Sequence, residues 1–311
     1  MPSSLLWVLF NVAVLAFLAL DLGVFNRRPH VVPFKEAAAW SATWVALSLV
    51  FNVFIYLWHG PEPALQFLTG YVLEYSLSMD NVFVFAVIFG TTGVAAQFQH
   101  RVLFWGIIGA LVMRGLFIYA GVQLVSRFEW VMYVFGAVLI ISGVKLVTEK
   151  KSKIEPEKSR VLRVARRFLP VLPQFEGSSF FVKRNGRRFA TPLFLVLVLV
   201  EATDVLFAVD SIPAIFAVTK DPLIIYTSNV CAILGLRAMY FMLAGAILRF
   251  RYLRPGLALI LVFVGFKMLL AHFYPISTVV SLAVITCVVA AAIMLSLRAV
   301  AVPSHPVKTD K

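Results

Sequence analysis

Residues 73–87 read Leu73-Glu74-Tyr-Ser-Leu-Ser-Met-Asp80-Asn81-Val-Phe-Val-Phe-Ala-Val87, which places two acids inside an apolar stretch. Residues 201–215 place three there: Glu201-Ala-Thr-Asp204-Val-Leu-Phe-Ala-Val-Asp210-Ser211-Ile-Pro-Ala-Ile215. A carboxylate at the centre of a bilayer costs roughly 2.5–3.5 kcal/mol or more, so such acids usually have a partner or a function. The two stretches are therefore the first candidates for a functional site within a membrane protein.

Apolar segments long enough to cross a membrane recur along the whole chain. Hydrophobic residues make up 61% of the 311 residues and the mean hydropathy is +0.92, whereas a soluble domain is close to half apolar. We predict an all-α polytopic membrane protein with about nine transmembrane helices. The predicted spans are 5–25, 37–58, 65–90, 102–125, 130–147, 192–218, 223–248, 256–271 and 276–297.

The distribution of basic residues predicts the orientation of the chain. The formal net charge is +13, which in a soluble protein would suggest a nucleic-acid partner. Here nearly all the basic residues fall in loops on one side of the predicted membrane, and the opposite side has only Arg127 and Lys220. The positive-inside rule then places the N-terminus outside and the C-terminus in the cytoplasm. We expect no nucleic-acid partner.

The two acidic stretches belong to segments of related sequence. Each has an acid, an Asp six positions later and then Asn81 or Ser211. Downstream, Arg114 resembles Arg237, and Gly143-Val-Lys145 resembles Gly265-Phe-Lys267. The third to fifth spans and the sixth to eighth spans thus form a repeat of three helices each, and an odd number inverts the second unit. The predicted regions are 1–63 (two peripheral helices), 64–148 (first unit), 149–190 (cytoplasmic basic loop), 191–273 (second unit) and 274–311 (last helix and tail).

The loop between the two units has features of its own. Residues 159–169 alternate apolar and arginine residues, which predicts an amphipathic basic helix suited to the anionic cytoplasmic leaflet. A solvated linker helix is the alternative. Asn185-Gly186, between short alternating runs, predicts a tight β-hairpin. Anionic membrane lipids are therefore the partners that we expect for this loop.

Charge and ligand chemistry favour a cation as the substrate. The five acids outnumber Arg114 and Arg237, the two deeply placed bases, so about three negative charges remain if all are ionised. An alternative is that the arginines simply pair with Asp80 and Asp210. The donors near the motifs are oxygens, which suit Mg, Ca and Mn better than Zn or Cu, and Met79 is a possible soft donor.

Helix geometry divides the acids. Glu74 and Asp80 are six residues apart, so on a straight helix they point roughly 120° from each other. Either the helix breaks near Met79, or the two acids serve different neighbours. Glu201 and Asp204 share one face, and Pro213 follows Asp210 closely. A proline inside a helix frees a carbonyl that could join a cation site.

The two motifs, together with Asp21-Leu-Gly-Val-Phe25 and Asn185-Gly-Arg-Arg-Phe-Ala-Thr-Pro-Leu193, resemble those of the TerC/Alx integral membrane family. The resemblance covers nearly the whole chain. It implies membership of the lysine-exporter-like transporter superfamily and, for the Alx branch, export of manganese from the bacterial cytoplasm. It assigns metal handling to seven residues here: Glu74, Asp80, Asn81, Glu201, Asp204, Asp210 and Ser211.

Together these observations predict an exporter of divalent cations in the bacterial inner membrane. Manganese is the favoured ion and Ca²⁺ is an alternative; carboxylate protonation would help release the ion. We expect no enzymatic activity and no resident cofactor. Alternatives are an exporter of cationic amino acids and a membrane-assembly factor that moves no ion. The sequence leaves protein partners open.

Overall fold

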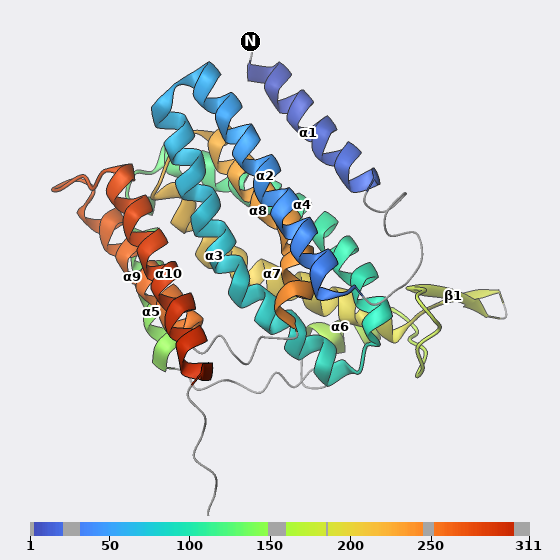
Figure 1. Cartoon of the computed structure of the whole chain (residues 1–311). Coiled ribbons are helices and arrows are strands. Elements are labelled where there is room, and N and C mark those ends of the chain that lie inside the picture. The colour runs from blue at the N-terminus through green and yellow to red at the C-terminus, as the bar shows by residue number, and fades with distance from the viewer. Residues whose placement is uncertain (1–2, 21–31, 149–159, 185, 245–251, 302–311) are drawn as a thin grey trace, which may run out of the picture.

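The computed structural model describes residues 3–20, 32–148, 160–184, 186–244 and 252–301, which form an α-helical bundle with one small β-hairpin (Figure 1). The helices are α1 (Ser3–Leu20), α2 (Phe34–His59), α3 (Pro61–Thr92), α4 (Ala96–Arg127), α5 (Val131–Thr148), α6 (Arg160–Phe168), α7 (Pro192–Phe216), α8 (Pro222–Ala244), α9 (Leu253–Leu270) and α10 (Thr278–Ala301). The strands are β1 (Phe181–Arg184) and β2 (Arg187–Ala190).

The helices confirm the predicted all-α membrane architecture. Eight of those described, α2 to α5 and α7 to α10, are long and apolar enough to cross a membrane, and α1 contains a shorter apolar helix, Leu5–Ala19. Each corresponds to one predicted span. The ends of two predicted spans, residues 21–25 and 245–248, lie outside the described residues.

The helices that carry the acidic motifs are both continuous. α3 begins with Pro61 after Gly60 and ends at Gly93, whose φ of 68° is left-handed and favours glycine. It runs through Met79 without a break, so the possibility of a broken helix there is not realised. α7 begins with Pro192, a favoured first residue of a helix, and continues past Pro213 to its last turn.

The two three-helix units pack on each other. α3 packs extensively on α8, α4 packs on α7, and α5 packs on α9. α3, α4 and α5 of the first unit correspond to α7, α8 and α9 of the second. The packing of α3 on α8 therefore corresponds to the packing of α7 on α4. In Figure 1, α3 descends through the bundle whereas α7 ascends. Both features are those of an inverted repeat.

Glycines bring α5 and α9 together reciprocally. A Cβ on Gly143 would lie 2.8 Å from the carbonyl oxygen of Ala258, and a Cβ on Gly265 would lie 2.7 Å from that of Gly136. In the sequence alignment of the units Gly143 matches Gly265, and in the same register Gly136 matches Ala258. Each unit therefore repeats the other's contact, as a two-fold relation requires. Small residues allow this close approach in membrane helices.

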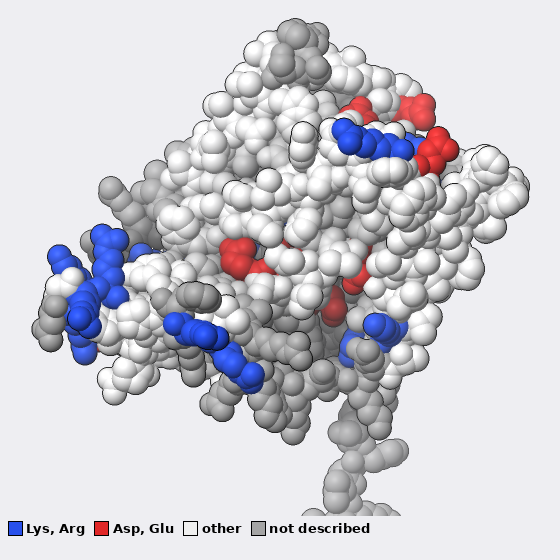
Figure 2. Space-filling model, turned by 180° about the vertical axis from the view of Figure 1, so that it is seen from behind, with Lys and Arg blue, Asp and Glu red and all other residues white. Residues whose placement is uncertain are grey.

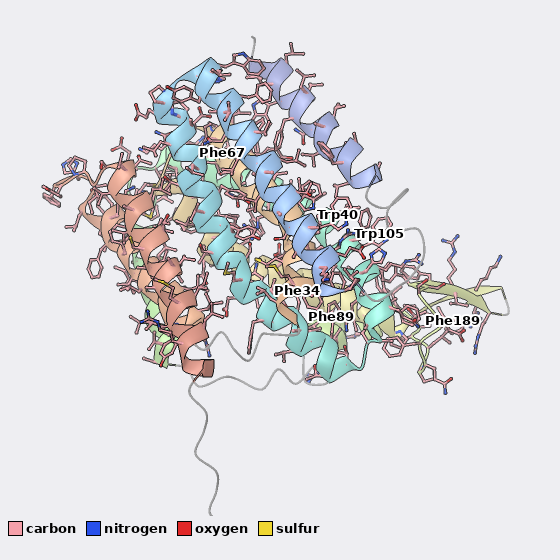
Figure 3. The ribbon with its side chains drawn as sticks, in the orientation of Figure 1. Phe34, Trp40, Phe67, Phe89, Trp105 and Phe189 are labelled. Carbon is pink, nitrogen blue, oxygen red and sulfur yellow. The ribbon has the colours of Figure 1, made fainter. Side chains whose placement is uncertain are left out.

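Apolar side chains fill the bundle from end to end. Phe67 and Phe89, near the upper and lower ends of α3 in Figure 3, are 0% and 1% exposed. Phe67 contacts Phe51 of α2 edge-on, and Phe89 contacts Tyr240 of α8 in the same way. This packing anchors α3 between α2 and α8, so the middle of α3 is held in the interior.

The loop between the units contains the predicted helix and hairpin. α6 packs against α7, with Leu162 buried. β1 and β2 pair antiparallel, with Lys183 opposite Arg188 and Arg184 opposite Arg187. Figure 2 shows that basic side chains gather at the lower end of the molecule, where the hairpin projects, whereas the upper end mixes acidic and basic side chains.

Candidate functional site

A buried ion-pair cluster joins the two units at the middle of the bundle. Arg114 of α4 is 1% exposed, and its Nη1 donates to Glu74 Oε1 of α3 and, at 2.9 Å, to Asn229 Oδ1 of α8. Its Nε lies 3.9 Å from Asp204 Oδ2 of α7. We call these four residues the Arg114 cluster. One guanidinium thus contacts both of the equivalent acids, Glu74 and Asp204.

Asn229 fixes the arginine from a third direction. Its side chain is 0% exposed, and its Nδ2 donates to Ile225 O of the preceding turn at 3.0 Å. This bond turns Oδ1 of Asn229 toward Arg114. Charge-assisted, buried hydrogen bonds of this kind specify a single arrangement because an unsatisfied group would be costly there. The cluster is therefore a preorganised structural centre of the bundle.

A cavity of about 110 Å³ adjoins the cluster. We call it the acidic cavity; its polar lining consists of Glu74, Asp80, Asn81, Arg114, Ser142, Asp210 and Ser211. The apolar lining comes from α3, α5, α7 and α9. Ser142 of α5 donates to Asp210 Oδ1 at 2.5 Å, which orients that carboxylate. Both units therefore supply oxygen donors to one space.

Two oxygens at this cavity have unused hydrogen-bonding capacity. Glu74 Oε2 and Ser211 Oγ are buried and have no hydrogen-bond partner of normal geometry in the described part of the chain, although the Ser211 hydroxyl faces the Glu74 carboxylate. Buried polar atoms normally have partners, and exceptions mark sites for water or an ion. Both of these oxygens belong to residues that line the cavity, whereas Arg114 Nε and Asp204 Oδ2 of the Arg114 cluster also lack a hydrogen-bond partner in the described chain.

Glu201 lies apart from both groups. Its carboxylate rests against the α4 backbone at Gly109, in the space that a Cβ there would occupy. Glu201 is partly exposed and does not line the acidic cavity. Gly109 thus makes room for this acid between α7 and α4, a contact that spacing along one helix could not reveal.

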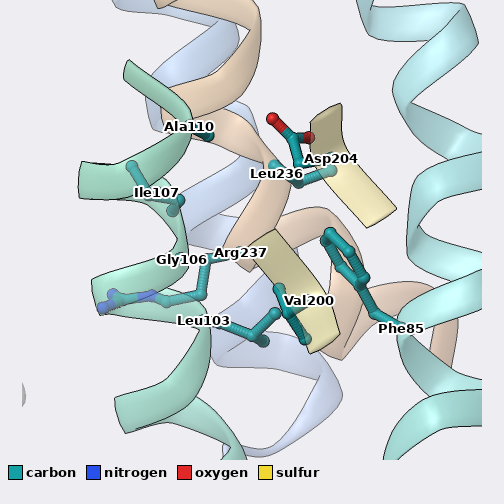
Figure 4. Close-up of a pocket in the computed structure, with 9 residues that line it drawn as sticks. All are labelled: Phe85, Leu103, Gly106, Ile107, Ala110, Val200, Asp204, Leu236 and Arg237. Carbon is teal, nitrogen blue, oxygen red and sulfur yellow. The ribbon is translucent and has the colours of Figure 1, made fainter. Parts of the chain in front are cut away.

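Arg237 does not reproduce the role of Arg114. Figure 4 shows a narrow pocket between α4, α7 and α8, lined by both Asp204 and Arg237. The guanidinium of Arg237 points toward α4, on the side of Gly106, and away from the carboxylate of Asp204. The equivalent arginines of the two units are therefore engaged differently in this conformation.

The seven predicted metal-handling residues do not form one compact cluster. Within residues 3–20, 32–148, 160–184, 186–244 and 252–301, no three Asp, Glu, His or Cys side chains form a group that could hold a metal ion. Glu74, Asp80, Asn81, Asp210 and Ser211 surround the acidic cavity, Asp204 belongs to the Arg114 cluster, and Glu201 lies apart.

Two expectations about individual residues change, and two residues of the site were not predicted. The alternative in which the arginines pair with Asp80 and Asp210 predicted that Arg114 contacts Asp80. Arg114 instead contacts Glu74 and Asp204. Met79 does not line the acidic cavity but packs against a cluster of buried apolar residues. Ser142 and Asn229 were not predicted; their only signal was a polar residue within an apolar span.

Comparison with known proteins identifies the family of this chain. Residues 59–302 match the model of the integral membrane protein TerC family. An uncharacterized membrane protein, STKORF319, from Myxococcus xanthus is 56% identical over 94% of this chain and 92% of its own. A putative membrane-bound redox modulator, Alx, from Escherichia coli K12 is 48% identical over 91% of each chain. No solved structure matches. The chain belongs to the TerC family of integral membrane proteins.

Proposed function

We propose that this protein exports a divalent metal cation across the bacterial inner membrane, with manganese as the favoured ion. The acidic cavity is the proposed binding site; its carboxylates are not gathered into a compact group of metal ligands in the described conformation, so the proposed movement of the units would have to bring them together. The N-terminus would lie outside and the basic end of the bundle in the cytoplasm, following the positive-inside rule. Family membership supports a multi-pass membrane protein, and the chemistry of the cavity supports a cation.

The charge of the cavity lining carries this proposal. Three carboxylates (Glu74, Asp80 and Asp210) and one guanidinium (Arg114) face the same space. Carboxylates therefore outnumber the guanidinium in the lining, and Lys145 of α5 is a further base near Asp210. An excess of carboxylates favours a cation over an anion there, because burial strengthens electrostatic interactions. The lining therefore matches a cation in the sign of its charge.

The size and donors of the cavity narrow the substrate class. A volume of about 110 Å³ is below the roughly 300–1,000 Å³ of typical pockets for organic ligands, which disfavours a cationic amino acid. It accommodates an ion with some of its waters, the usual state of small hard cations. Carboxylate, amide and hydroxyl donors suit Mn, Mg or Ca. Preference for manganese rests on the resemblance to the Alx branch.

Transport would follow from the inverted construction. Rocking of one unit against the other would expose the cavity first to one side of the membrane and then to the other. Because Glu74 is on α3 and Asp210 is on α7, such a movement would change the distance between the donors. Protonation of the carboxylates on the outer side would weaken their hold on the ion and complete the exchange.

The test is Mn²⁺ transport into inverted membrane vesicles from cells that express each variant. We expect D80N and D210N to abolish uptake while the protein still inserts at normal levels, because each removes charge and a donor from the cavity. Glu129 is an exposed acid between α4 and α5 and does not line the acidic cavity, so the E129Q variant should transport Mn²⁺ normally. Normal uptake by both cavity variants would refute the proposal, and competition by Mg²⁺, Ca²⁺ or lysine would identify another substrate.

A further inference from the structure

The β1–β2 hairpin is fixed to the bundle at its base. Arg101 of α4 donates to Ser178 Oγ at 2.9 Å, and its guanidinium carbon lies 5.3 Å from the centre of the Phe180 ring. The ring of Phe181 contacts that of Phe194 at 4.5 Å. These contacts join the residues leading into the hairpin and its first strand to α4 and α7. The base of the hairpin is therefore held in a defined position.

The hairpin lies at the level where the chain enters the membrane. β2 ends at Ala190, and α7, a candidate membrane span, begins at Pro192. Between them, Thr191 donates its hydroxyl to Ser179 O at 2.7 Å. In Figure 1 the hairpin projects sideways beyond the helices rather than continuing along the bundle. A strand rises about 3.3 Å per residue, so the four-residue strand β1 reaches roughly 13 Å outward from its base.

The outer part of the hairpin is strongly basic. We call Lys183, Arg184, Arg187 and Arg188 the basic hairpin; all four side chains are exposed. They face one another in two like-charged pairs, Lys183 with Arg188 and Arg184 with Arg187. Directly opposed like charges destabilise a β-ladder. An external anion would relieve that repulsion.

Only part of this charge is neutralised within the described chain. Glu176 accepts from Arg184 Nη2 at 2.5 Å, on the exposed surface. Lys183 and Arg188 share the other face of the ladder, because side chains alternate along a strand. In the described part of the chain no carboxylate forms a salt bridge with either of them. This face is therefore the best place for an external anion.

We propose that the basic hairpin binds the headgroups of anionic lipids in the bilayer that surrounds the protein. Its level at the start of α7 and its sideways projection place the charges over lipid rather than in open solvent. Exposed Arg163 and Arg167 of α6, which precedes the hairpin, extend the basic surface. The proposal does not depend on the transported substrate.

The test compares retention of two lipids by the purified protein. Wild-type protein and variants in detergent are mixed with equal amounts of phosphatidylglycerol and phosphatidylcholine of identical acyl chains, and bound lipids are counted by native mass spectrometry. Each basic residue near an anionic surface contributes about 1 kcal/mol, so K183Q/R188Q should lose roughly thirtyfold of the preference for phosphatidylglycerol. Removing an opposed like-charged pair should not weaken folding of the hairpin.

A charge-matched control separates lipid binding from net charge. R127Q/K220Q removes the same charge from exposed positions at the other end of the bundle and should keep the wild-type lipid ratio. The proposal is overturned if wild-type protein shows no preference for phosphatidylglycerol, or if K183Q/R188Q retains the full preference. Full retention of the preference by K183Q/R188Q is also the result expected if the basic hairpin binds an acidic protein instead of lipid.

Discussion

Replacing Arg114 by Met should be among the most damaging single changes to the stability of this protein. The side chain is 1% exposed and is the cationic partner of Glu74 and, more distantly, of Asp204. Methionine preserves much of the volume but leaves two carboxylates facing each other without the guanidinium. Removing one partner of a buried pair costs about 3–5 kcal/mol because the remaining charge is uncompensated. We expect R114M to lose about 3 kcal/mol of unfolding free energy.

A double-mutant cycle distinguishes charge from packing. E74Q alone should cost less, because Arg114 retains Asn229 and the proximity of Asp204. E74Q/R114M should be more stable than R114M by at least about 1 kcal/mol, since one of the uncompensated charges is gone. Unfolding of each variant would be followed by circular dichroism during SDS titration in mixed micelles.

The control for this cycle is R127M, at an exposed position of the same helix, which should change stability by less than about 0.5 kcal/mol. If R114M unfolds with the wild-type free energy, or if E74Q/R114M is no more stable than R114M, the buried-charge argument is wrong. R114K should recover only part of the loss, because an ammonium group lacks the planar fork that contacts acceptors on three helices.

Three further changes test other parts of the site. G109A should leave metal export close to that of the wild type, because the Glu201 carboxylate that its methyl group would displace lies outside the acidic cavity; a several-fold loss of export in vesicles would contradict this. S142A should weaken Mn²⁺ affinity roughly tenfold or more, because a hydrogen bond to a charged group contributes about 1.5–3 kcal/mol, and an unchanged binding isotherm would contradict it. G265V should cost roughly 1–3 kcal/mol in SDS titration through overpacking, and wild-type stability would show that α5 and α9 can separate at no cost.

Most of the fold could be predicted from the sequence because hydropathy and charge dominate in a membrane protein. Spans must be long apolar helices, since every backbone group has to be satisfied internally. The Asn185-Gly186 pair marked the hairpin, although residue 185 itself lies outside the described residues. What the sequence could not provide was the partner of each helix. The packing of α3 on α8 and of α4 on α7 joins helices from different units, and such contacts have no local signature.

The candidate site was predicted in composition but not in arrangement. The acids were identified because a charge in an apolar run is rare. Their neighbours depend on rotation about each helix axis and on contacts across helices. The 120° argument predicted a broken helix or different neighbours for Glu74 and Asp80; α3 is continuous, Glu74 contacts Arg114, and both acids line one cavity. Asn229 and Ser142 are ordinary polar residues in sequence and became part of the site only through packing.

The position of Glu74 suggests how the two parts of the site would communicate. One oxygen accepts from Arg114, and the other is buried at the cavity without a normal hydrogen bond in the described chain. A cation in the acidic cavity would attract this second oxygen and draw charge density away from Arg114. Asp204 would then become the stronger partner of the guanidinium. Under the proposed function, cation binding at α3 would thereby alter an ion pair on α7, linking occupancy of the cavity to the relative position of the two units through a single carboxylate.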